Sequence, residues 1–231
     1  MSRKNIKEAQ GMKSIVGMVV VILLNITIVS GEVTRKTFYN PDKTVRHIFY
    51  SEEKEIAKQI VNEDKNIVET VGKIPDGMIK EYYEDRTLKG EWEYKNGRLE
   101  GIGRIYYQSG ELMFAYNYKE GTLEGIIKKY YRNGKLANEW NYKDGKREGI
   151  AKSYYKGGSL KAMWNYKGDQ LDGIARIYYD DGRIQYIDTY RNGTKINRKA
   201  YDKKGKLEFD QDYPFEEKEK NSIVESVKKG G

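Results

Sequence analysis

One motif recurs along the chain at a constant spacing of 24 residues. The segment EGIIKKYYRNGKL begins at Glu124, and close copies, EGIGRIYYQSGEL and EGIAKSYYKGGSL, begin at Glu100 and Glu148. Its glycine recurs at the same spacing, at Gly77, Gly101, Gly125, Gly149 and Gly173. A fixed period of this length is the signature of an array in which each unit is stable only beside its neighbours.

Each copy carries the same residue types at the same places. A base stands three residues after the glycine, a pair of tyrosines and a turn follow, and aromatic residues two apart come later, such as Trp140 and Tyr142. Aromatics at positions i and i+2 share one face of a strand, and Asn-Gly or Asp-Gly dipeptides favour tight turns. The pattern predicts a mainly β fold, in which each copy is a β-hairpin and the stacked hairpins form one elongated, twisted antiparallel sheet.

The segments that flank the array predict a cap and a tail. Residues 35–50, RKTFYNPDKTVRHIFY, resemble a degenerate copy of the motif. Residues 51–64 predict a short helix, because Ser51 can cap its N-terminus and an apolar stripe follows. That stripe consists of Ile56, Ile60 and Val61. The predicted organisation is an N-terminal cap at 32–76, a repeat array at 77–213 and a polar tail at 214–231.

Residues 1–31 are predicted to be a secretory signal peptide. Lys13 precedes an apolar run from Ile15 to Val29, which is shorter than the roughly 20 residues that a membrane-spanning helix needs. Small or modest residues then lead to Gly31, as a signal peptidase site requires. We therefore expect export to the periplasm, the cell surface or the medium. The alternative is a membrane anchor formed by an uncleaved helix.

The composition argues against catalysis. The chain has no cysteine and a single histidine, His47, which we interpret as a surface or packing residue. Disulfides, thiolate nucleophiles and cysteine-based zinc sites are thereby excluded. No phosphate-binding loop, dinucleotide-binding fingerprint or serine elbow appears either. We predict that the chain is not an enzyme and has no catalytic, cofactor-binding or metal site.

The array shares its pattern with a known repeat family. The pattern is G-x-x-K/R-x-Y-Y-x-x-G-x-L followed by x-Y-K-x-G, and one copy meets it at Gly125, Lys128, Tyr130, Tyr131, Gly134, Leu136, Tyr142, Lys143 and Gly145. It resembles the MORN repeat in its bacterial variant form, and similar bacterial chains are often identified as antitoxins of the YwqK family. The resemblance implies protein binding, scaffolding or contact with anionic phospholipids.

Two sets of side chains are the candidate partner-binding residues. The base of each copy lies two residues before the first tyrosine, so both side chains point to the same side of a strand. In the middle copies they are Arg104, Tyr106, Lys128, Tyr130, Lys152, Tyr154, Arg176 and Tyr178. If the second tyrosine of each pair faces outward instead, the aromatic members are Tyr107, Tyr131, Tyr155 and Tyr179. The alternative is that these side chains only pack, cover the sheet and keep the chain soluble.

A set of acids is predicted to oppose the bases. It consists of Asp76, Glu100, Glu124, Glu148 and Asp172. We expect these carboxylates to pair with the bases across strands. The formal net charge of +8 favours anionic partners, but the mixed signs along the array argue against nucleic acid.

These observations predict a non-enzymatic protein-binding or scaffolding repeat protein of the cell envelope or exterior. An antitoxin-like immunity protein that acts outside the cytoplasm fits this description. The alternative is an envelope-surface module that binds anionic phospholipid or cell-wall glycan through the tyrosines and bases. The sequence leaves the partner and the oligomeric state open.

Overall fold

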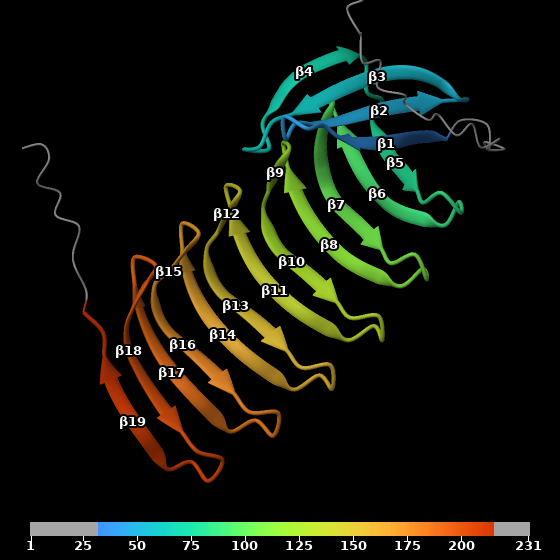
Figure 1. Cartoon of the computed structure of the whole chain (residues 1–231). Coiled ribbons are helices and arrows are strands. Elements are labelled where there is room, and N and C mark those ends of the chain that lie inside the picture. Colours follow the sequence, from blue (N-terminus) through green and yellow to red (C-terminus); the bar gives the residue numbers. More distant parts are fainter. Residues whose placement is uncertain (1–31, 215–231) are drawn as a thin grey trace, which may run out of the picture.

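The structure, a computed structural model, describes residues 32–214, and every regular element in this range is a β-strand (Figure 1). Nineteen strands belong to a single sheet. Within this range, no helix is long and apolar enough to span a membrane. The predicted signal peptide, residues 1–31, and residues 215–231 of the predicted tail lie outside the described residues.

The N-terminal part of the sheet is a meander of two hairpins. Its strands are β1 (Val33–Tyr39), β2 (Val45–Ser51), β3 (Lys54–Val61) and β4 (Ile67–Gly72). Consecutive strands pair antiparallel, and β1 also pairs in parallel with β5 through Thr34 and Lys80. The meander is therefore attached to the array by its first strand, in the order β4–β3–β2–β1–β5. This parallel contact makes the sheet mixed, which corrects the expectation of a purely antiparallel sheet.

The helix predicted at 51–64 is wrong, because this segment forms a tight turn and strand β3. Glu52 and Glu53 have φ of 49° and 64°, as the two central residues of a type I′ hairpin turn require. The apolar spacing of Ile56 and Ile60 fits one face of a strand as well as a helical stripe. Strands β2 and β4 pair with β3 on its two sides, and this pairing selects the strand.

The β3–β4 hairpin is a second degenerate copy of the motif. The segments NPDKT, NEDKN and YEDRT, which begin at Asn40, Asn62 and Tyr83, form the same turn. In each, the N–H of the first residue donates to the carbonyl four residues later, over 2.9, 3.0 and 2.9 Å. The similarity of these three segments was the sequence signal for this copy, because the tyrosine pair is missing from it.

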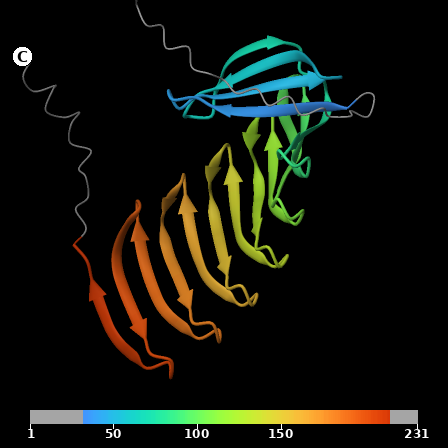
Figure 2. The ribbon, with the colours of Figure 1, turned by 45° about the vertical axis from the view of Figure 1, so that its right-hand side comes forward.

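The array follows as stacked hairpins whose strands curve in the same direction (Figures 1 and 2). Its long strands are β5 (Gly77–Tyr82), β6 (Leu88–Lys95), β7 (Arg98–Tyr106), β8 (Leu112–Lys119), β10 (Gly125–Tyr130), β11 (Leu136–Lys143), β13 (Gly149–Tyr154), β14 (Leu160–Lys167), β16 (Gly173–Tyr178), β17 (Ile184–Arg191), β18 (Thr194–Tyr201) and β19 (Leu207–Asp212). Two-residue strands flank the turns, namely β9 (Thr122–Leu123), β12 (Lys146–Arg147) and β15 (Gln170–Leu171). Successive long strands pair antiparallel, which confirms the predicted elongated sheet of hairpins.

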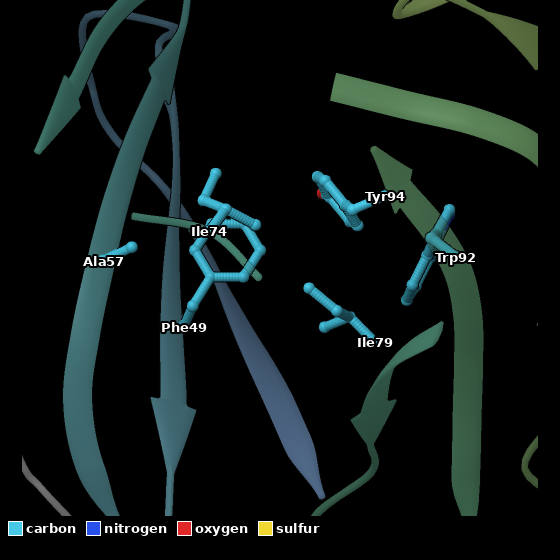
Figure 3. Packing of buried hydrophobic residues seen from close by; sticks show 6 residues of the cluster. All are labelled: Phe49, Ala57, Ile74, Ile79, Trp92 and Tyr94. Atoms are coloured by element: carbon cyan, nitrogen blue, oxygen red, sulfur yellow. The ribbon is translucent and has the colours of Figure 1, made fainter. Parts of the chain in front are cut away.

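The best-buried apolar cluster lies where the meander folds against the first hairpins of the array (Figure 3). Phe49 of β2 meets Tyr94 of β6 edge-on, with the ring centroids 5.4 Å apart. Ile74, from the connection between β4 and β5, and Ile79 of β5 pack into the same cluster. The meander thus covers one face of the first units, as a cap does.

Arginines pair with buried carboxylates at both ends of the array. At the N-terminal end, Arg35 contacts Glu81 at 3.1 Å and lies 3.6 Å from the ring centre of Trp92. At the other end, Arg198 donates two hydrogen bonds of 2.7 Å to Asp188, which occupies the place that tryptophan or tyrosine has in the other copies. Each pair lies at the end of the row of aromatic side chains. No further full copy packs against the row at that end.

Candidate binding face

The strand register sorts the repeated side chains onto two faces of the sheet. In β10 and β11, Lys128 lies opposite Glu139, whereas Ile127 lies opposite Trp140. Because side chains alternate along a strand, the bases and the large aromatics point to opposite faces. We call the face with the bases the binding face and the face with the tryptophans the aromatic face.

The binding face carries a row of exposed aliphatic side chains that the sequence interpretation missed. The residue after each motif glycine lies on this face, two positions before the base, and the row is Met78, Ile102, Ile126, Ile150 and Ile174. Their exposed fractions are 43%, 43%, 43%, 46% and 48%. The signal was present in the sequence as an apolar residue at a fixed place in every copy. Asn141 of the intervening strand lies opposite Ile126, so the aliphatic side chains alternate with asparagines across this face.

Hydrogen bonds hold the main chain beneath this row in place. The side-chain amide of Asn117 donates to the carbonyl of Ile126, and that of Asn141 donates to the carbonyl of Ile150, each over 2.7 Å. These bonds connect one copy to the next. The isoleucines therefore project from a backbone that is fixed by its neighbours.

The predicted bases differ in their pairing. Arg104 contacts Glu91 at 3.0 Å, and Lys152 lies 3.8 Å from Glu139. Lys128 and Arg176 form no ion pair with any residue between 32 and 214. Two of the four predicted bases therefore present a charge on the binding face that the described part of the chain does not neutralise.

The first tyrosine of each pair lies on the binding face, beside the base. The hydroxyl of Tyr106 donates to Glu91 over 2.8 Å, and that of Tyr178 lies 3.9 Å from the sulfur of Met163. The hydroxyls of Tyr130 and Tyr154 have no hydrogen-bond partner within residues 32–214. The structure thus places the eight predicted partner-binding residues on one face, together with the aliphatic row.

The second tyrosine of each pair joins one copy to the next. The hydroxyls of Tyr107, Tyr131 and Tyr155 each donate to the main-chain carbonyl of the first tyrosine in the following copy, over 2.8, 2.7 and 2.7 Å. Tyr179 makes the corresponding bond to Tyr201 over 2.9 Å. These hydroxyls form hydrogen bonds within the fold. The alternative set of outward-facing tyrosines is therefore structural.

The acids do not oppose the bases, which corrects the prediction of cross-strand pairing. Glu100 accepts the main-chain N–H of Glu120 over 2.8 Å, and Glu124 accepts that of Asp144 over 2.9 Å. The remaining acids of the set make equivalent bonds, 20 residues ahead in each case. Their carboxylates hold the tight turn of the next hairpin, whose left-handed residues leave N–H groups without a partner in the ladder.

The aromatic face is closely packed along its centre. A small or aliphatic residue at its centre is buried in each copy, with Ile127 exposed by 3%, Ala151 by 2% and Ala175 by 1%. Partial burial raises the pKa of Tyr116 on this face to about 12. Its residues stabilise the array.

A polar cluster fixes the cap to the first hairpin. Thr37 donates to Glu81 over 2.9 Å, and the Nδ1 atom of His47 lies 3.1 Å from the same threonine oxygen. Since the threonine proton points to Glu81, the Nδ1–H form of neutral His47 satisfies the contact. Burial, together with the nearby charge of Arg35, lowers the pKa of His47 to about 4. His47 is thus a packing residue in a polar environment.

The fold and the register define an open β-repeat array with the large aromatics on one face and the bases, first tyrosines and exposed aliphatic residues on the other. A family model of the MORN repeat variant matches four consecutive copies, at residues 99–120, 123–144, 147–167 and 171–192. Residues 99–192 therefore contain four copies of the MORN repeat variant, in agreement with the sequence resemblance.

No curated protein matches the chain. Among solved structures, a crystal structure of the GtfA/B complex bound to UDP and GlcNAc matches at 12% identity and a TM-score of 0.23. The match covers 49% of this chain and 22% of the other.

Proposed function

We propose that this chain is a non-enzymatic binding or scaffolding protein that holds a protein partner on its binding face. The observation that carries the proposal is the row of isoleucines beside unpaired cations. Each of these isoleucines is nearly half exposed, so a partner that covered it would gain on the order of 1 kcal/mol.

The chemistry of this face specifies the kind of protein surface that fits. The cations of Lys128 and Arg176 select carboxylates, and the isoleucines select apolar side chains. The ring of Tyr130 adds contact area at a low cost in conformational entropy. Because the same contacts recur in successive copies, several weak interactions can act together on one extended partner.

We further propose that the protein acts at the cell envelope or outside the cell, and that its partner there makes it an immunity-type protein. The support is the apolar segment that ends before Gly31. Mass spectrometry of the protein from its own cells is expected to find an N-terminus at or near Glu32. Full-length chain found only in the cytosol would contradict export and leave the binding proposal to its own test.

The test of the binding face begins with a pull-down from the cell envelope and identification of the captured protein. The four bases Arg104, Lys128, Lys152 and Arg176 are then changed to glutamine together, and affinity for that protein is measured by calorimetry. The matched control changes four exposed cations outside the binding face to glutamine, namely Lys43, Arg132, Lys156 and Lys203. Both variants lose the same charge, so only a local role of the bases predicts a loss of affinity in the first variant alone.

A second set of variants tests the apolar part of the face. Changing Ile126 and Ile150 to threonine keeps the β-branched shape that suits a strand and removes exposed apolar area. We expect weaker binding with an unchanged circular dichroism spectrum. Unchanged affinity in both the base and the isoleucine variants would show that the partner binds at the cap or the turns.

An anionic membrane or wall polymer is the second candidate for the same face. The observation that favours it is the combination of Ile126, Lys128 and Tyr130 on one surface, because membrane interfaces bind aliphatic, cationic and tyrosine side chains. This candidate predicts salt-sensitive binding to vesicles that contain anionic lipid, or to isolated cell walls, without a fixed stoichiometry. A protein partner predicts a discrete complex instead.

A further inference from the structure

The residues that lie opposite the bases change in character along the binding face. One position on the second strand of each hairpin faces the bases, and in successive copies it is Glu91, Ala115, Glu139, Met163 and Ile187. The strand register places each of the four predicted bases between two of these positions. Glutamates occur only in the first part of this row, and its last two positions are apolar.

Arg176 of β16 is the predicted base that has an apolar residue on both neighbouring strands. It lies opposite Met163 of β14 and opposite Ile187 of β17 (Figure 1). Along its own strand, Ile174 and Tyr178 lie two positions away and point to the same face. The hydroxyl of Tyr178 lies 3.9 Å from the sulfur of Met163, so these two side chains meet on this face. Apolar and aromatic side chains therefore surround the guanidinium group.

The charge of Arg176 is also unpaired. Among the ion pairs between residues 32 and 214 none includes Arg176, whereas Arg104 contacts Glu91 at 3.0 Å and Lys152 lies 3.8 Å from Glu139. A guanidinium group can donate two parallel hydrogen bonds to one carboxylate. Apolar neighbours that exclude water strengthen such a bond. Arg176 therefore has the setting in which one ion pair contributes most to binding.

We propose that Arg176 is the main contact residue of the binding face and that it binds a side-chain carboxylate of the protein partner. This inference rests on the proposed function, because it assumes that a protein occupies the face. A membrane would engage the cations of all copies, whereas the setting of Arg176 differs from that of the other three bases, which favours a protein.

The spacing of the surrounding side chains predicts the sequence of the partner. In an extended segment that runs along β16, residues two apart are separated by about 6.6 Å, which is also the spacing of Ile174, Arg176 and Tyr178 along the strand. The partner is therefore expected to carry an aspartate or glutamate with apolar residues two positions before and after it.

A library of random peptides displayed on phage, selected on the full-length chain, tests this expectation. One enriched peptide is then made with acetylated and amidated ends, so that only its side chains carry charge, and its affinity is measured by calorimetry. We expect the affinity to fall at least about tenfold when the acidic residue of the peptide is replaced by its amide, and by a similar factor with Arg176→Gln. The matched control, Lys203→Gln, removes the same charge from an exposed turn and should leave the affinity unchanged.

Met163→Glu is a second variant, which should keep the fold and block the site. Glutamate occupies the corresponding place in two other copies, so the strand accommodates it. Its carboxylate would lie opposite Arg176 and neutralise the charge, as Glu91 does for Arg104. The peptide should then bind about as weakly as it does to Arg176→Gln, whereas Met163→Gln, which adds no charge, should weaken binding less. The circular dichroism spectrum should be unchanged in every variant.

The assignment would be overturned if the selection yields no peptide or peptides without an acidic residue. It would also be overturned if Arg176→Gln or Met163→Glu binds the enriched peptide as tightly as the parent chain does. If the captured envelope protein still loses affinity when all four bases are changed, the proposed function stands and only the role of Arg176 is rejected. If the peptide behaves as expected but the captured protein binds independently of Arg176, the site stands and that protein occupies another surface.

Discussion

Tyr130 and Tyr131 are neighbours in the chain and identical in chemistry, but they have different roles. Strand alternation turns Tyr130 to the binding face, where its hydroxyl has no partner within residues 32–214. Tyr131 begins the turn, and its hydroxyl donates to the carbonyl of Tyr154 in the next copy over 2.7 Å. At the residue scale, the tyrosine pair therefore combines an exposed side chain with a link between copies.

Changing Tyr131 to phenylalanine should lower the free energy of unfolding by about 1 kcal/mol, because the half-buried carbonyl of Tyr154 loses its donor. The matched control is Tyr130→Phe, for which we expect a change within about 0.5 kcal/mol. Urea denaturation followed by circular dichroism measures both. Equal losses in the two variants would show that the hydroxyl of Tyr131 is not a specific link.

A substitution at Ser153 should increase the stability of the protein. Its side chain is 7% exposed, and its hydroxyl has no hydrogen-bond partner. A buried hydroxyl without a partner costs free energy, whereas a methyl group at the same place does not. Ser153→Ala should raise the free energy of unfolding by up to about 1 kcal/mol, measured in the same urea titration. A loss of stability would mean that a bound water satisfies this hydroxyl.

At the element scale, the junction between the meander and the array is sensitive to acid. Its groups come from β1, β2, β5 and β6, and they include His47, Glu81, Arg35 and Lys89. Burial by itself would raise the pKa of Glu81, but the charges of Arg35 and Lys89 outweigh it, so this pKa is lowered. The pKa of His47 is lowered to about 4 by burial.

Stability should therefore fall as the pH decreases from 6.5 to about 4. In this window the unfolded chain binds a proton at His47 that the folded chain does not, so acid favours unfolding by at most about 3 kcal/mol. Glu81 contributes a further loss of stability only when the pH falls below 4.5, the ordinary pKa of a glutamate. Urea titrations at successive pH values measure this slope.

The control for the pH effect is His47→Gln, which keeps a side-chain amide near Thr37 and cannot titrate. In this variant the free energy of unfolding should no longer depend on pH between 6.5 and 4.5. It should still fall at lower pH. An unchanged slope would assign the acid sensitivity to other groups.

At the scale of the whole molecule, the constant period makes the array modular. Deletion of residues 125–148 joins Glu124 to Gly149, which occupies the same place in the motif. Tyr107 can then donate to the carbonyl of Tyr154 in place of Tyr130. We expect a folded, shorter protein with the same circular dichroism per residue and a cooperative unfolding transition.

Deletion of residues 125–147, one residue fewer, is the matched control. It shifts all later strands by one position and turns the apolar set to the wrong face. This variant should unfold or aggregate. If both deletions fold equally well, the copies are not coupled through their register.

Several features of the fold were predictable because they depend on local periodicity. The hairpins, the turns and the opposite orientation of neighbouring side chains follow from the spacing of Tyr142, Trp140 and Lys128 alone. The helix predicted at 51–64 failed because the spacing of Ile56 and Ile60 suits both a helix and a strand. Only the neighbouring strands β2 and β4 distinguish the two.

The sequence by itself determined the array of 24-residue hairpins, four of which match the MORN repeat variant, because the residues of each copy specify its own strands and turns. Tertiary structure alone decided the roles of repeated residues, since equal spacing does not reveal which group contacts the next copy. Glu124 holds a turn, Tyr131 joins two copies and Ile126 remains exposed, although all three recur equally regularly. Tertiary structure also decided the parallel pairing of β1 with β5, because this pairing depends on contacts between segments that are distant in the sequence.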